Sequence, residues 1–122
     1  MRILLLLVSG MAIANAQKPK TPGVNYYRDI EPILNSSCVS CHQESMAAGG
    51  LKLDAPENLL QGGASGKAVV PGKADRSLLY QRLTVTTDKR MPPVGALTEE
   101  QLALIRAWIN LGAKIGPAPA KR

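Results

Sequence analysis

The residues with the most distinctive chemistry in this chain are its two cysteines and its one histidine. All three lie in the run Cys38-Val39-Ser40-Cys41-His42. Two thiols separated by two residues, with a histidine directly after the second, match the signature of covalent c-type haem attachment. At the end of a helix this spacing puts both thiols on one side, where they reach the two vinyl groups of one ring. We therefore predict one haem c (iron), bound through thioethers to Cys38 and Cys41 and ligated by the imidazole of His42.

Three other uses of paired cysteines fit the sequence less well. A structural zinc site needs four ligands, and the chain has no further Cys or His. A thioredoxin-like redox pair follows a strand, whereas the apolar residues Ile30, Ile33 and Leu34 before Cys38 have helical spacing. A disulfide across two intervening residues closes a very small loop and would stabilise little.

A second axial ligand for the iron has to come from a methionine, because no second histidine and no further cysteine exist. Met46 follows His42 by only four residues, so it lies by the same face of the ring. Met91 lies far downstream, and the following Pro92 favours an extended backbone that can hold a thioether against the opposite face. A lone methionine is also a common gap-filling core residue. Elimination and the stiff segment favour Met91 as the second axial ligand.

The first sixteen residues have the pattern of a cleaved export signal. A basic start ending at Arg2 precedes the apolar stretch 3–8, and Ala14-Asn15-Ala16 is a small-residue cleavage site. A buried helix or a retained anchor is the alternative, and it fits this end poorly. We predict a signal peptide at residues 1–16, a periplasmic (extracytoplasmic) location, and no transmembrane segment in the mature chain.

The rest of the chain is one small domain with a modest positive charge. Removing Arg2 from the 15 basic residues leaves 14 against 9 acidic ones, a net charge of +5. This fits docking to an acidic surface on a redox partner protein, although an ordinary solvated surface explains it equally well. No basic run is interleaved with aromatics, so we expect no nucleic-acid binding. The sequence leaves open whether the protein is free or associates with a membrane redox complex.

Hydrophobic spacing and capping residues predict four helices, and no strand pattern is strong enough to predict a strand. The expected helices start at Asp29, at Asp54 as the cap of a helix to Gln61, at Asp75 as the cap of a helix to Thr84, and at the capping box Thr98-Glu99-Glu100-Gln101. The last helix ends at Gly112 and places Trp108 in the core, with Leu111 on an adjoining apolar stripe. We interpret the glycine-rich stretch 62–72 as a surface loop.

The predicted domain organisation follows from these patterns. It comprises the signal peptide at 1–16, a mobile N-terminal lead at 17–24, a cytochrome c domain at 25–115 and a disordered tail at 116–122. With no Phe and only four aromatic residues, so short a domain needs a cofactor to complete its core.

An ordered series of motifs between Tyr26 and Ala113 resembles the planctomycete-type cytochrome c domains. The series is Asp29-Ile30-x-Pro32-Ile33-Leu34, Cys38-x-x-Cys41-His42, Gly50-Leu51-x-Leu53-Asp54, Val70-Pro71-Gly72-Lys73, Ser77-Leu78, Arg90-Met91-Pro92-Pro93 and Leu97-Thr98-x-x-Gln101. The resemblance implies a small all-α, class I-like fold of about four short helices around one covalent haem. It also implies His42 and Met91 as the axial ligands.

Such a centre predicts an electron-transfer protein rather than an enzyme. The alternative is a haem-based peroxidase or gas sensor, in which Met91 dissociates and lets a small molecule reach the iron. Peroxidase chemistry needs a distal acid–base group, and only Glu and Arg are left to provide it. A module that uses haem only as a structural staple is a third class. Arg82 or Lys73 are candidates to neutralise a haem propionate, and an exposed salt bridge is the alternative role for either.

Overall fold

Residues 23–120 are described by a computed structural model of this chain. The predicted signal peptide, most of the predicted lead at 17–24 and the last two residues of the predicted tail lie outside the described residues. The elements, in chain order, are η1 (Tyr26–Ile30, a π-helical turn), α1 (Glu31–Ser37), β1 (His42–Gln43), β2 (Met46–Ala47), η2 (Ala48–Gly50, 3₁₀), α2 (Pro56–Gln61), η3 (Ala74–Arg76, 3₁₀), α3 (Leu78–Thr84) and α4 (Glu99–Asn110).

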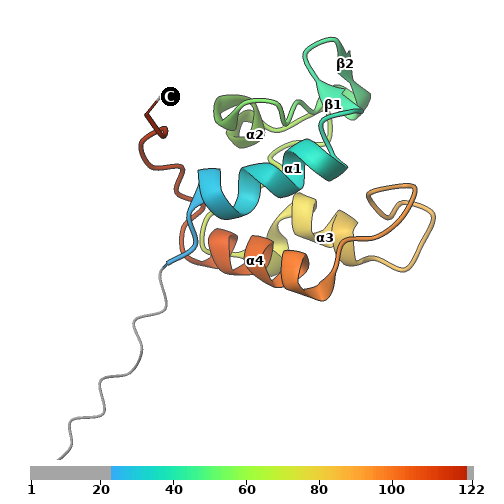
Figure 1. The fold of residues 1–122 in the computed structure, drawn as a ribbon. Coiled ribbons are helices and arrows are strands. Elements are labelled where there is room, and N and C mark those ends of the chain that lie inside the picture. The colour runs from blue at the N-terminus through green and yellow to red at the C-terminus, as the bar shows by residue number, and fades with distance from the viewer. Residues whose placement is uncertain (1–22, 121–122) are drawn as a thin grey trace, which may run out of the picture.

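In the view of Figure 1, α1 runs between α2 and the β1–β2 hairpin on one side and α3 and α4 on the other. Helix α4 packs against η1, η3 and α3. Trp108, predicted in the core, is 1% exposed, and its ring centroid lies 5.6 Å from that of Tyr26. Burial raises the pKa of the Tyr26 hydroxyl to about 12, so this side chain stays neutral within the core.

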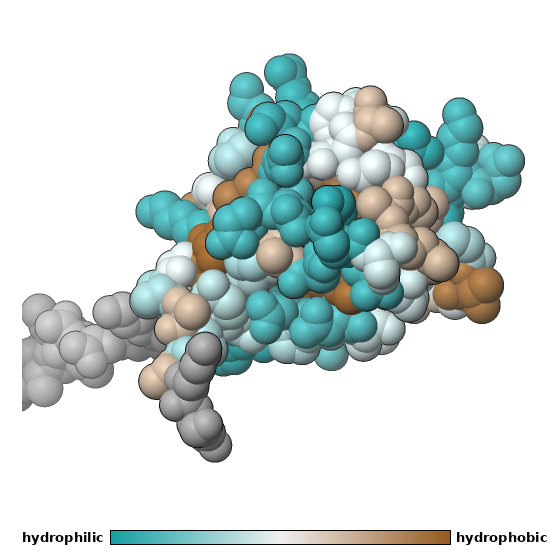
Figure 2. Space-filling model, turned by 90° about the horizontal axis from the view of Figure 1, so that it is seen from above, coloured by the Kyte–Doolittle hydropathy of each residue, from teal (hydrophilic) through white to brown (hydrophobic). Residues whose placement is uncertain are grey.

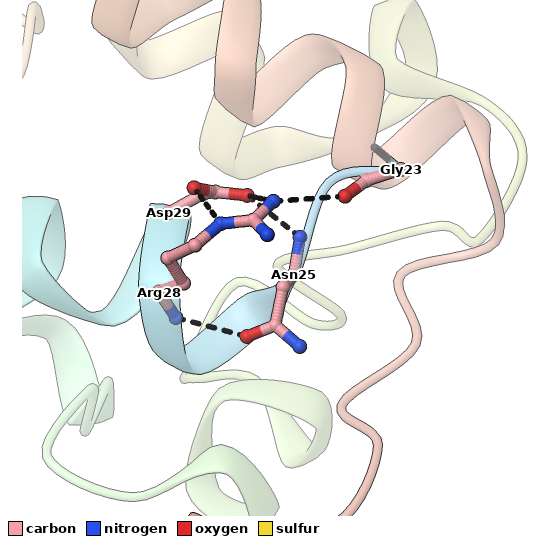
Figure 3. A network of polar contacts seen from close by, with 4 residues as sticks. All are labelled: Gly23, Asn25, Arg28 and Asp29. Atoms are coloured by element: carbon pink, nitrogen blue, oxygen red, sulfur yellow. Dashed lines mark hydrogen bonds and ion pairs between the residues drawn. The ribbon is translucent and has the colours of Figure 1, made fainter. Parts of the chain in front are cut away.

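Helical structure begins earlier than the sequence predicts, because the turn η1 starts at Tyr26 and leads directly into α1. The chain turns at Asn25, whose side chain accepts a hydrogen bond from the backbone N–H of Arg28, 2.9 Å away. The Arg28 guanidinium donates to both carboxylate oxygens of Asp29 and to the carbonyl of Gly23 (Figure 3). This hydrogen bonding lowers the pKa of Asp29. Pro32 is the second residue of α1, a position at which its missing backbone N–H breaks no bond within that helix.

The fold is mostly helical, but it is not strictly all-α as predicted. β1 and β2 form an antiparallel hairpin in which His42 pairs with Ala47 and Gln43 pairs with Met46. Two-residue strands are too short to show an alternating pattern in the sequence, which is why the prediction missed them.

Two predicted helix caps are wrong, because the carboxylate of each aspartate contacts another part of the chain and does not cap a helix. Asp54 accepts from the backbone N–H of Glu44, and α2 starts only at Pro56. Asp75 lies within η3 and faces Arg106 at 3.6 Å, while α3 starts at Leu78.

The predicted residues at the start and at the end of the last helix are largely confirmed. The capping box of α4 is present between Thr98 and Gln101. Gly112 follows the helix with φ at +109°, the left-handed region that favours glycine. The prediction for Leu111 is wrong, since it is 61% exposed.

Polar side chains cover much of the face seen in Figure 2, and hydrophobic ones reach the surface only in small separate patches. The large exposed hydrophobic residues among those described are Met46, Leu60, Val94 and Leu111. Within the part of the chain that the structure covers, no helix has both the length and the apolar character to cross a membrane. Residues 116–120 form no helix or strand and are exposed.

Ser77 fixes the start of α3 and is fully buried. Its Oγ accepts from the backbone N–H of Val70 at 2.9 Å and donates to the carbonyl of Lys73 at 2.9 Å. Both bonds join the segment before η3 to the helix that follows it. The hydroxyl is therefore engaged with Val70 and Lys73 and does not cap α3.

Replacing Ser77 with Ala should lower the free energy of unfolding by about 1–3 kcal/mol, because it removes the partner of the part-buried N–H of Val70 and empties a buried position. Urea unfolding followed by far-UV circular dichroism measures the change. Ser36→Ala is the matched control, since Ser36 is exposed and its hydroxyl contacts the carbonyl of Ile33 and the hydroxyl of Ser37 within its own helix. Equal stability of the two variants would contradict this role for Ser77.

Candidate haem-binding site

A cavity of about 260 Å³, half open to solvent, lies between the segment that follows the cysteines and helix α3. Most of its lining is apolar or has no side chain. The residues lining it are His42, Ala48, Gly49, Leu51, Leu53, Gly63, Ser65, Gly66, Ala68, Leu78, Leu79, Arg82 and Met91. Both predicted axial ligands, His42 and Met91, therefore border one cavity although 49 residues separate them in the sequence.

The two cysteines lie in the turn that connects α1 to β1. Cys38 follows directly on α1, and its carbonyl accepts from the backbone N–H groups of Cys41 and His42. The thiols form no disulfide with each other. Burial raises the pKa of the Cys38 thiol to about 11, whereas Cys41 is exposed. Cys38 is thus a protonated thiol at neutral pH. Neither cysteine is among the residues lining the cavity.

Three hydrogen bonds fix His42 at the cavity. Its N–H donates to Cys38, and its carbonyl accepts from the N–H of Leu53 at 2.7 Å. The ring Nδ1 lies 3.2 Å from the carbonyl oxygen of Leu51. Because a carbonyl only accepts, Nδ1 carries a proton, and in the neutral form of the ring Nε2 then keeps a free lone pair. A neutral imidazole held in this way is the form that ligates a metal.

The hairpin that carries His42 is itself tied to the strand-like segment after it. The backbone N–H of Glu44 donates to the carboxylate of Asp54 at 3.0 Å, and this bond lowers the pKa of Asp54. The carboxylate of Glu44 lies 2.7 Å from the ammonium of Lys52. These contacts bring residues 51–54 alongside the hairpin, which is what positions the carbonyl of Leu51 over the imidazole.

Only one of the two candidate methionines reaches the cavity. Met91 lines it, and its backbone N–H donates to the carbonyl of Arg82 at 2.7 Å. Met46 lies on β2, is 56% exposed and does not line the cavity. The structure thus brings Met91 and His42 together and leaves Met46 at the surface.

The glycine-rich stretch was predicted to be a simple surface loop, and for part of it this is wrong. Gly63 and Gly66 pair in an isolated bridge and line the cavity. A Cβ on Gly63 would lie 2.9 Å from the carbonyl oxygen of Gly49, so only glycine allows this close approach. The cavity therefore has a wall made largely of backbone.

These residues fit a haem. An imidazole with a free Nε2 and a thioether border the same space, and the remaining wall is small or apolar, as a large flat hydrophobic ring requires. Sequence reasoning missed the carbonyl of Leu51 and the glycine wall. The clustered glycines at 62–66 were a signal for close backbone approach; nothing in the sequence signals the carbonyl.

Comparison with known proteins agrees with this geometry. Residues 38–95 match the family model described as Planctomycete cytochrome C. This match contains both cysteines, His42 and Met91. No curated protein matches the chain.

One similar solved structure is Kuenenia stuttgartiensis Hydrazine Synthase, with a TM-score of 0.55 and 27% sequence identity. The match covers 81% of this chain and 17% of that one. The present chain thus corresponds to a small part of the larger protein.

Gly63→Ala tests the backbone wall. The added Cβ would push residue 63 away from the segment that contains Gly49 and Leu51, and we expect the free energy of unfolding of the pigmented protein to fall by about 1–3 kcal/mol. Gly23→Ala is the control, because its Cβ would meet nothing within 4 Å. Chemical denaturation of both variants gives the comparison. A Gly63→Ala protein as stable as the control would show that the wall tolerates a side chain.

Proposed function

Since this chain carries a planctomycete-type cytochrome c domain, we propose that it is an exported electron-transfer protein with one covalently attached haem c. The family implies covalent haem c. The presence of one haem, and its use in one-electron transfer between redox partners, is our proposal. The observation that carries it is the meeting of His42 and Met91 at one largely apolar cavity, with Cys38 and Cys41 in the turn directly before His42.

When bound, haem c supplies an iron that cycles between Fe(III) and Fe(II), one electron at a time. Cys38 and Cys41 are the groups that would anchor it through thioethers. His42 offers Nε2 as the first axial ligand, with its tautomer set by the Leu51 carbonyl. Met91 offers its thioether as the second. If His42 and Met91 both ligated the iron, no coordination position would be left for a substrate, which favours electron transfer over catalysis.

The lining of the cavity favours the reduced state. Leu51, Leu53, Leu78 and Leu79 give the cavity an apolar lining, and such a low-dielectric lining would disfavour the more highly charged oxidised state of a bound haem. A thioether ligand acts in the same direction, because Met/His ligation raises the reduction potential. We therefore expect a potential above that of a comparable centre with two histidine ligands.

The proposed location and partners rest on the sequence and on surface charge. The pattern of residues 1–16 supports export to the periplasm. Lys89 and Arg90 are exposed directly before Met91, so a positive surface adjoins the candidate ligand. This charge supports brief docking to redox proteins with acidic surfaces. Such a partner could be a soluble protein or part of a membrane redox complex.

A second function is favoured by one observation. Met91 belongs to residues 85–97, which form no helix or strand, and one backbone hydrogen bond to Arg82 ties it to α3. A weakly held ligand could leave and admit a small molecule, as in a peroxidase or a gas sensor. The similarity to part of a hydrazine synthase, an enzyme, belongs to this alternative.

The optical spectrum separates the two functions. The oxidised protein should show the weak near-infrared band of sulfur–iron ligation, and the reduced protein should bind carbon monoxide poorly. Met91→Ala should lose the band and bind carbon monoxide readily. Met46→Leu is the matched control and should behave like the wild type, since Met46 lies outside the cavity. A wild-type protein without the band that binds carbon monoxide at once would favour the sensor or peroxidase.

A further inference from the structure

We propose that the guanidinium of Arg82 binds a propionate carboxylate of the haem and thereby sets the charge beside the iron. This inference rests on the proposed function, since it concerns the same site. It assigns to Arg82 a positioning and tuning role for which the structure gives three separate arguments.

The first argument is the polarity of the cavity. Apart from His42, whose ring is already committed, its polar side chains are those of Ser65 and Arg82. Arg82 is the cationic residue among those lining it. The only anionic groups on a haem are its two propionates. A cation on the wall of an otherwise largely apolar cavity that is half open to solvent is therefore placed to meet them.

The second argument is that Arg82 is not engaged elsewhere. Among residues 23–120, the ion pairs are Arg28–Asp29, Lys52–Glu44 and Arg106–Asp75. Arg82 is half-buried and takes part in none of them. A guanidinium offers a planar fork that binds both oxygens of a carboxylate, and partial burial makes such a pair stronger than an exposed one. The alternative of an exposed salt bridge thus finds no support in the described residues.

The third argument separates Arg82 from Lys73, the other cation considered from the sequence. Lys73 is exposed, precedes η3 and does not line the cavity. Arg82 lies one helical turn after Leu78 and Leu79 on α3, and all three line the cavity. The helix therefore turns Arg82 toward the site and leaves Lys73 outside it.

Arg82 acts on the site through two different groups. Its carbonyl, in the last turn of α3 where carbonyls lack helical partners, accepts from the N–H of Met91. Its side chain supplies the positive charge. A substitution of the side chain keeps the backbone bond, so charge and ligand positioning can be tested independently.

The test compares Arg82→Gln with Arg76→Gln, an exposed arginine on η3 that does not line the cavity. Removing a positive charge beside the iron disfavours reduction. In equilibrium with a fixed redox mediator, the reduced-to-oxidised ratio of Arg82→Gln should fall about three- to tenfold, the size of one screened charge interaction near a protein surface. Resonance Raman spectra should show a shifted propionate-bending band. Arg76→Gln should change neither.

Arg82→Gln should also keep the near-infrared sulfur–iron band, because the backbone bond to Met91 is retained. A ratio and a Raman band equal to those of Arg76→Gln would overturn the inference, and so would loss of the sulfur–iron band. If Arg82→Gln does not accumulate, Arg82→Lys takes its place. It keeps the charge but loses the fork, so an unshifted propionate band in Arg82→Lys would overturn the inference too. Failure of the proposed function would be seen differently, as a wild-type protein without covalently bound pigment.

Discussion

The hydrogen bond between the Nδ1 of His42 and the carbonyl of Leu51 is the contact on which the site depends. It fixes the tautomer of the only histidine in the chain and leaves Nε2 free. The segment of Leu51 is held beside the hairpin by the bond from the N–H of Leu53 to the carbonyl of His42, and by the contacts of Glu44 with Asp54 and Lys52. A short polar cluster at the surface thus lies next to the segment that contacts the imidazole of His42, and the other walls of the cavity come from elsewhere in the chain.

Those walls come from segments that have little structure of their own. Gly63 approaches Gly49 so closely that backbone replaces side chains on one side, and Gly66 pairs with Gly63 in an isolated bridge. Helix α3 supplies the other side, and Ser77 anchors its start through buried hydrogen bonds. Met91 then reaches the cavity through a single backbone bond to the end of α3. The scaffold of η1, α1 and α4 is well packed, whereas the ligand segment depends on few contacts.

Much of this arrangement follows from local sequence, and the rest does not. The motif at 38–42, the capping box at Thr98 and the burial of Trp108 each depend on neighbours within a few residues, so they could be predicted. Asp54 and Asp75 were predicted as helix caps, but each has a partner distant in sequence that the local pattern does not reveal. The hairpin was too short to leave a pattern. The role of the Leu51 carbonyl is a backbone contact, which side-chain identity does not encode.

The family match and the cavity point to the same chemistry from independent directions. The central claim is that two sulfur atoms of this chain hold the pigment by covalent bonds. The most direct measurement is to produce the protein with haem-attachment machinery, denature it and extract it with acidified organic solvent. Our account predicts that the red pigment stays with the polypeptide, and that Cys38→Ala together with Cys41→Ala releases it. Extraction of the pigment from the wild-type chain would contradict the account.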